Sequence, residues 1–341
     1  MILVNDPGSS AAYWPLKHAQ WNGWTPTDLI FPFFLFIVGV SLVLSFESRL
    51  KRGDSRRVLV VHALRRSATI FAIGLLLNGL PHFHLATWRI PGVLQRIAVA
   101  YLAAVLITLY SRTNARIVWI AALLVGYWVL MRFAPVPGYG IPTHDIPLLH
   151  PGANLAAYLD RKLMTGHLWE GTRDPEGVLS TLPAIATTLC GVLAGEWLRS
   201  SRSPKQKAGW MLASGMAGLI AGELWGIWFP INKNLWTSSY VLFTAGFAMV
   251  CLALCYWTID IKPYRGGWTK PFVIFGSNAI AAYVISEVLG GTFGWKDYIF
   301  QRFFARVAPP GLASLLYSLA IVGVCFVPIW WMYRKRIFLK A

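Results

Sequence analysis

Nine stretches of about 20 mostly apolar residues follow one another along this 341-residue chain and constrain its fold more than any other feature. A helix needs roughly 20 apolar residues to cross a bilayer, where its backbone polar groups must be paired within the segment. A soluble domain would not carry 56% hydrophobic and only 13% charged residues. We therefore predict an all-α fold, a polytopic transmembrane helix bundle, with nine spans over residues 25–46, 58–80, 91–110, 116–134, 179–198, 208–229, 235–257, 272–290 and 313–332.

Lys and Arg are distributed unequally between the two sides of this predicted bundle. Alternate connections, starting with residues 47–57, hold 18 of them, and the connections on the other side hold nine. Basic residues accumulate in the cytoplasmic loops of membrane proteins. The pattern therefore predicts a cytoplasmic C-terminus and places residues 5–24 on the outer side.

The net charge of +17 has two interpretations, nucleic-acid binding and contact with anionic membrane lipids. A nucleic-acid surface gathers its basic residues on one face, often with interleaved aromatic residues, whereas here they are spread over short turns. We expect these residues to anchor the protein to lipid headgroups and predict no nucleic-acid partner.

A single membrane domain over residues 1–341 is expected, because no repeat or soluble segment interrupts the spans. The one long connection, at about 135–178, is rich in Pro and Gly and lies on the predicted outer side, where long loops often carry function. Residues 1–4 are apolar but too short to span. We interpret them as the remnant of a first helix whose beginning is absent from this sequence.

Polar side chains occupy the outward parts of several predicted spans. Such groups are costly at membrane depth and by default mark an interior cavity or pathway. Ten of the 14 acidic residues lie on the outer side, so a cavity there would attract a cationic or amine-bearing substrate. The candidate substrate contacts are Asp28, Glu223, Asp174, Glu176, Asn232 and Asn234.

Each candidate also has a structural interpretation. Asp28, in the run TPTD, would cap the helix that follows, since carboxylates favour a helix N-terminus. Glu223 would pair with Arg96 inside the bundle. The asparagines of FPINKNLW and the acidic residues of DPEG have the composition of turns.

His18 lies in the run WPLKHAQWNGWTPTDLIFPFF, where polar groups directly precede an aromatic span. An imidazole titrates near neutrality, so it can take a proton from an attacking amine and return it. The alternative is an interfacial histidine without a chemical role. His82 and His84 form an H-x-H pair without Cys or carboxylates at metal-ligand spacing, so no metal site is predicted.

Seven blocks of the sequence, in family order between residue 2 and about 287, resemble the heparan-alpha-glucosaminide N-acetyltransferase family and its bacterial relatives. Hydrophobicity alone would not reproduce this shared order. The blocks are MILVNDPG, KHAQWNGWTPTDLIFPFFLFIVGVSL, PGVLQRIAVAYL, AAYLDRKLMTGHLW, DPEGVLSTLPAIATTLCGVLAGEWLR, FPINKNLWTSSYVLFTAGFA and FGSNAIAAYVISEV.

The resemblance implies a membrane enzyme that uses cytosolic acetyl-CoA to acetylate the terminal glucosamine amine of a glycan on the far side of the membrane. It carries the active-site histidine to His18 and an important asparagine to Asn5. It also implies a possible homodimer. For a bacterial relative, we expect the inner membrane, a periplasmic His18 side, and an amino-sugar glycan or glycolipid as acceptor.

These lines combine into one hypothesis, an acetyltransferase with His18 as the base and with Asn5 either as a hydrogen-bond donor to the oxyanion or as the group that orients the imidazole. The outward carboxylates would hold the amino sugar. The residues expected to contact acetyl-CoA are Gln95, Arg96 and Lys233. A covalent acetyl-histidine relay is a rival pathway. A membrane transporter for a sugar or other small polar solute is the alternative function, and a non-enzymatic scaffold is a third.

Overall fold

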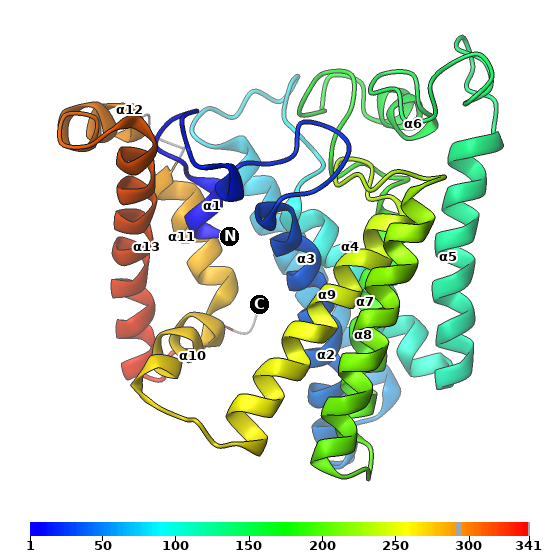
Figure 1. Ribbon diagram of the computed structural model, residues 1–341, viewed down its shortest axis with the longest axis vertical. Helices are drawn as coiled ribbons and strands as arrows, with labels where there is room; N and C mark the ends of the chain where they lie inside the picture. The colour runs from blue at the N-terminus through cyan, green and yellow to red at the C-terminus, as the bar shows by residue number, and fades with distance from the viewer. Residues whose placement is uncertain (291–294, 340–341) are drawn as a thin grey trace.

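The computed structural model describes residues 1–290 and 295–339, and these residues form helices and connections without a β-strand (Figure 1). The prediction of an all-α fold is confirmed for this part of the chain. The α-helices are α1 (Ile2–Asn5), α2 (Ile30–Leu50), α3 (Arg56–Gly79), α4 (Val93–Tyr110), α5 (Thr113–Phe133), α6 (Leu155–Leu163), α7 (Thr181–Arg199), α8 (Pro204–Gly226), α9 (Ser238–Cys255), α10 (Lys270–Ser277), α11 (Ala279–Gly290), α12 (Trp295–Ile299) and α13 (Pro310–Arg334).

Within residues 1–290 and 295–339, seven helices are long and apolar enough to cross a membrane. They are α2 with the preceding 3₁₀ turn η2 (Pro26–Leu29), α3, α4, α5, α7, α9 with its π-helical extension η3 (Tyr256–Ile261), and α13. The pair α10–α11 meets the same test but is bent by 80°, and counting it as one span gives eight. The predicted count of nine spans is therefore not confirmed.

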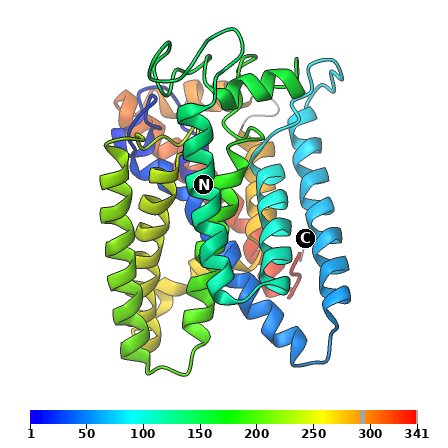
Figure 2. The same cartoon turned by 90° about the vertical axis from the view of Figure 1, so that its right-hand side faces the viewer.

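The helix that falls short is α8, whose 23 residues would be long enough to span. Its glycines, together with Ser214 and Glu223, dilute the apolar residues and lower its mean hydropathy. The length and position of α8 predicted a span, but its mean hydropathy is lower than that of the other long helices. Figure 2 shows α8 running beside the other long helices all the same.

The long helices run side by side between two ends of the molecule (Figures 1 and 2). One end holds residues 6–29, the connection 80–92 and the long connection 135–178 with α6, and we call it the His18 end. The opposite end holds the connections from α2 to α3, from α4 to α5 and from α7 to α8. Residues 5–24 and the long connection thus lie at the same end.

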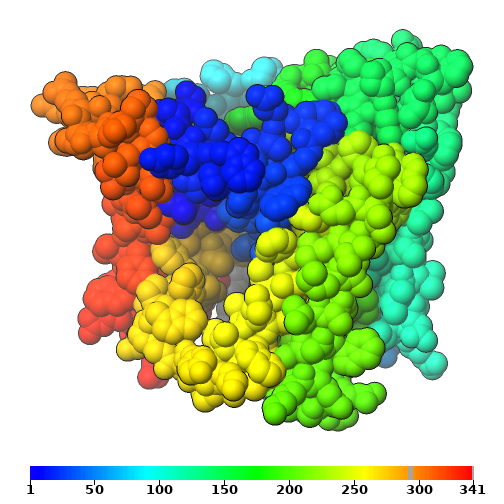
Figure 3. All heavy atoms as spheres, viewed as in Figure 1, coloured from blue at the N-terminus to red at the C-terminus, as the bar shows by residue number. Residues whose placement is uncertain are grey.

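Two groups of helices pack around separate apolar clusters. The larger cluster joins α2, α4, α7 and α9, with Leu35, Ala100, Leu189 and Val241 wholly buried. The smaller lies around Tyr317 of α13 and includes residues of α11 and α12. In Figure 3 the surface is hollowed below the N-terminal segment, between α9 and the α10–α11 pair. The cavities described below lie where these two groups meet.

Glycines bring the central helices into backbone contact. A Cβ at Gly191 of α7 would fall on the backbone of Phe36 in α2, and one at Gly246 of α9 would fall on the backbone of α8. Small residues favour helix association in membranes because the backbones can approach closely. The position of α2, which begins beside the candidate site, therefore depends on Gly191.

We predict that Gly191→Val lowers the free energy of unfolding by about 1–3 kcal/mol, because a side chain at this contact overpacks the interface. The measurement is thermal unfolding of the purified protein in detergent. Gly126→Val on α5 is the matched control, since a Cβ there meets no atom within 4 Å. Equal melting temperatures for the two variants would contradict the prediction.

Candidate active site

His18 and Asp28 form the polar centre of the His18 end. Nδ1 of His18 lies 2.7 Å from Oδ1 of Asp28. The carboxylate side chain is 1% exposed, whereas the imidazole is 50% exposed. A buried carboxylate bound to Nδ1 fixes the orientation of the ring and stabilises a proton on it. Nε2 is then the nitrogen that can accept a proton from a bound molecule.

The loop between these two residues is folded around the same carboxylate. Thr25 and Asp28 form a capping box at the start of η2, in which Oδ2 of Asp28 accepts from the backbone N–H of Thr25 at 3.1 Å. Oδ2 also accepts from the backbone N–H of Ala19 at 2.9 Å. The interpretation of Asp28 as a helix cap is therefore confirmed, and its second oxygen contacts His18.

Lys233, in the connection between α8 and α9, is the third member of this centre. Its Nζ lies 2.8 Å from Nδ1 and 3.3 Å from Nε2 of His18, and 3.4 Å from Oδ1 of Asp28. Nδ1 cannot both donate to Asp28 and accept from Lys233. Donation to the charged carboxylate is the stronger bond, and the ammonium then pairs with that carboxylate. Burial lowers the pKa of Lys233, against the opposing effect of Asp28.

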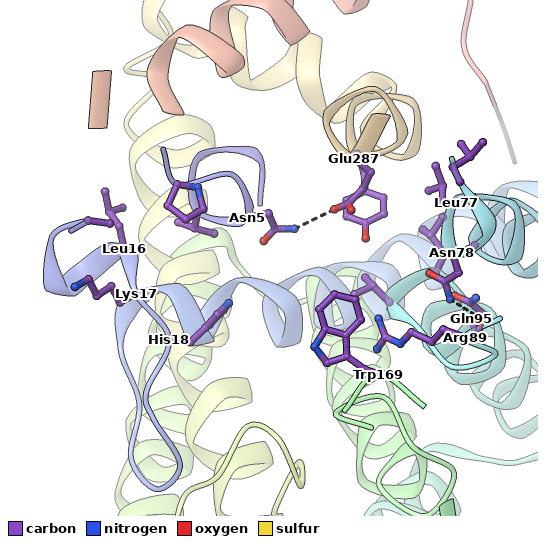
Figure 4. A pocket seen from close by; sticks show the side chains of 18 of the residues that line it. Asn5, Leu16, Lys17, His18, Leu77, Asn78, Arg89, Gln95, Trp169 and Glu287 are labelled. Carbon is purple, nitrogen blue, oxygen red and sulfur yellow. Dashed lines mark hydrogen bonds between the residues drawn. The ribbon is translucent and has the colours of Figure 1, made fainter. Parts of the chain in front are cut away.

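A cavity of about 780 Å³, which we call the site cavity, opens beside His18. Its wall includes Asn5, Glu287 and Tyr283 from the α1 and α11 side. Figure 4 shows His18 and Asn5 facing this space, with the Nδ2 of Asn5 donating to Oε1 of Glu287 at 3.4 Å. Asn5 and His18, both selected from the sequence, therefore line the same cavity.

A second cavity, of about 340 Å³, shares His18, Asn5 and three further residues with the site cavity, and we call it the side cavity. Asp28, Lys233 and Asn234 also line it. His18 therefore lies in the wall of both cavities.

An arginine that the sequence analysis did not select connects the two cavities. Arg89 binds Asp174 through Nε at 2.9 Å and Nη2 at 2.8 Å, and Nη2 also reaches Glu176 at 2.6 Å. Although burial by itself lowers it, pairing with the two carboxylates raises the pKa of Arg89. We call Arg89, Asp174 and Glu176 the Arg89 clamp. Asp174 and Glu176, expected to bind substrate directly, are occupied by this arginine.

Two more cavities continue from the site cavity toward the opposite end. The middle cavity, about 360 Å³ and mostly apolar, shares Val93, Leu94 and Tyr283 with the site cavity. The far cavity, about 330 Å³, shares five residues with the middle one, among them Phe34 and Ile97. Neighbouring cavities thus have common walls along the length of the bundle.

The far cavity has a polar lining that differs from that of the middle cavity. Ser41 and Ser45 of α2 and His62 and Arg66 of α3 contribute to it. Nε of Arg66 is buried and has no hydrogen-bond partner within the described residues. The far cavity therefore offers a cation and hydroxyl groups, the donors that bind phosphate.

The structure brings some of the remaining predicted residues to the cavities and leaves others away. Gln95 lines the site cavity, next to Asn78 in Figure 4. Arg96 is buried between α4 and the start of α7, where it donates to Ser180 at 2.5 Å, and it lines only a separate pocket of about 240 Å³. Asn232 is buried and bonds Leu235 and Asn22 as a turn residue. Glu223 is exposed on α8 and lines none of the cavities described above.

Arg89 and Trp169 were not selected because neither side chain, at its position in the sequence, indicates a particular chemistry. Arg89 is nevertheless the one Lys or Arg in the connection 80–92. A single basic residue on the predicted outer side could have indicated a partner among the outward carboxylates. Trp169 lies within the block AAYLDRKLMTGHLW but carries no charge to draw notice. Trp169 lies five residues before Asp174 in the chain. Its contact with Arg89, which binds Asp174, is visible only in the structure.

The sequence model of the family described as heparan-alpha-glucosaminide N-acetyltransferase, catalytic, matches residues 10–221, a range that holds His18, Asp28 and the Arg89 clamp. The chain belongs to this family. The proteins named heparan-alpha-glucosaminide N-acetyltransferase of Mus musculus and Homo sapiens are 32% and 33% identical to it, and both matches cover 100% of this chain. The chain spans 58% of the length of each.

We predict that Lys233→Met lowers the free energy of unfolding by about 1–3 kcal/mol, because the buried carboxylate of Asp28 then loses the cation that lies 3.4 Å from its Oδ1. Thermal unfolding of the purified protein in detergent measures the change.

Lys17→Met is the control for this measurement, since Lys17 is exposed and its charge is screened by water. Its free energy of unfolding should change by less than about 0.5 kcal/mol. A loss of stability as large in Lys17→Met as in Lys233→Met would contradict the role given to Lys233.

Proposed function

We propose that this chain transfers an acetyl group from acetyl-CoA to the amine of an amino sugar, with His18 as the base. The observation that carries the proposal is the row of cavities with common walls, which has the His18–Asp28 pair at one end and Arg66 at the other. Such a row suits a long donor that binds at one end of the bundle and reacts at the other.

The lining of each cavity fits a different part of acetyl-CoA. Arg66, His62 and the serines of the far cavity would hold its phosphates. The apolar middle cavity, with Phe34 and Ile97, suits the extended arm that carries the thioester. The acetyl group then enters the site cavity past Val93 and Leu94.

The chemistry follows from the geometry at His18. Nε2 takes a proton from the acceptor amine while the nitrogen lone pair attacks the thioester carbonyl, and Asp28 stabilises the resulting imidazolium. Asn5 donates a hydrogen bond to the oxyanion of the tetrahedral intermediate. When the C–S bond breaks, the sulfur leaves as a thiolate and takes the proton from His18, so that the base is regenerated.

The acceptor class and the sidedness complete the proposal. The relatives' names specify a glucosaminide, and we carry this to the present chain as an amino-sugar glycan or glycolipid. The excess of Lys and Arg at the opposite end supports a cytoplasmic far cavity and an outward His18, in the inner membrane of a bacterium. The possible homodimer stays a prediction.

We predict that His18→Gln lowers kcat by roughly 10²–10⁴-fold with little change in the KM for acetyl-CoA, because the base is lost and the donor site is not. The assay follows labelled acetyl transfer to a glucosaminide by membrane vesicles. His82→Gln, an exposed histidine at the same end, is the control. Full activity of His18→Gln would disprove the role of base.

The same vesicles separate the rival pathways. Labelled acetyl-CoA without acceptor, quenched rapidly, should leave the protein unlabelled if transfer is direct, whereas a covalent relay labels His18. A transporter would move a sugar without cleaving the thioester, so release of CoA that depends on the amino sugar excludes a function of transport alone.

We predict that Arg66→Met raises the KM for acetyl-CoA about ten-fold or more and leaves the KM for the acceptor unchanged, because a charge-assisted bond to phosphate is lost. Arg65→Met is the matched control, since Arg65 is exposed and lines none of the cavities. Initial rates at varied donor concentration measure the effect. An equal rise in both variants would point to a general charge effect instead of a phosphate site.

A further inference from the structure

We propose that Trp169 is the platform on which the acceptor sugar ring stacks, and that it selects cyclic amino sugars over acyclic amines. This inference rests on the proposed acetyl transfer to an amino sugar and adds the residue that recognises the ring. An exposed tryptophan alone is ordinary on a protein surface. The position and the support of this one carry the argument.

The position of Trp169 is at the junction of the two cavities around His18. It lines both the site cavity and the side cavity, as do His18 and Asn5. The residue is 67% exposed, and polar side chains line the two cavities around its ring. In Figure 4 the indole lies between His18 and Arg89, on the side of the cavity across from Asn5. The imidazole and this ring therefore face the same two cavities.

The indole is held in place from behind. The Arg89 guanidinium carbon lies 4.8 Å from the ring centroid, over the ring, and the Arg89 clamp fixes that guanidinium. The backbone N–H of Trp169 donates to Oδ2 of Asp174 at 2.9 Å, so the same carboxylate also fixes the main chain. A cation over an indole is attracted to its π face. One face is thus covered by Arg89, and the opposite face is the one left for a ligand.

A flat, fixed and exposed aromatic ring matches one feature of a pyranose, its face of C–H groups. That face packs on an indole, and the hydroxyl groups at the ring edge remain free for polar partners such as Glu287 and Asn78, which line the site cavity. Because Trp169 is already ordered, little conformational entropy is lost on binding. An acyclic amine has no such face and gains nothing from the platform.

The test compares three substitutions at position 169 in membrane vesicles. Trp169→Ala and Trp169→Leu should raise the KM for a simple glucosaminide about ten-fold, because stacking is lost, while Trp169→Phe should remain within about three-fold of the unchanged protein. The KM for acetyl-CoA should not change in any of them. Trp228→Ala is the control, an exposed tryptophan after α8 that lines none of the cavities.

A second acceptor separates stacking from general damage to the loop. Transfer to an acyclic amino alcohol should be equally slow in the unchanged protein and in Trp169→Leu. If the Phe and Leu variants are equally impaired toward the glucosaminide, or if Trp169→Ala keeps its KM, the platform is disproved. If the unchanged protein acetylates no amino sugar, the proposed function itself falls, which is a different result from either.

Discussion

The carboxylate of Asp28 is shared between the backbone and the imidazole, and the rest of the site depends on this sharing. One oxygen completes the capping box that starts η2 and α2, and the other binds His18. A side-chain oxygen at this position satisfies one of the free N–H groups of a helix start. The site thus obtains its charged partner for His18 from a group that the fold already requires. Stability and chemistry are therefore coupled at this residue, and a substitution that removes the charge also loosens the loop that presents the imidazole.

The cavities arise from the way in which the helices divide into two groups. Glycine contacts draw α2 and α7 close together, as they do α8 and α9, whereas α11 and α13 pack mainly with each other and with α1. The space between the groups is lined by α2 and α4 on one side and by α10 and α11 on the other. The 80° bend at α10–α11 places Gly276 and Ala279 on the walls of both the middle and the far cavity. Without this bend, a straight helix in place of α10–α11 would turn a different face toward the row of cavities.

The class of fold was predictable from the sequence, because apolar length determines whether a helix can span a membrane. Which face of each helix lies inside the bundle was not predictable. Glu223 was selected as a buried ionisable group, yet α8 is apolar or small on most sides, so periodicity does not distinguish an interior face from an exposed one. His18 and Asp28 were each selected, but their contact depends on a loop of nine residues whose path no local rule determines. Arg89 and its carboxylates lie 85 and 87 residues apart and required the tertiary structure.

The helix α2 runs from beside the His18–Asp28 pair to the far cavity as a single element. It begins at Ile30, two residues after Asp28, and Ser41, farther along it, lies in the wall of the far cavity. At 1.5 Å per residue the rise from Asp28 to Ser41 is about 20 Å. Under the proposed function, α2 therefore sets the length that the donor must have: an acyl donor held by its phosphates near Ser41 has to carry its reactive end over that distance. Acetyl phosphate has no such arm and would not reach His18 from the far cavity.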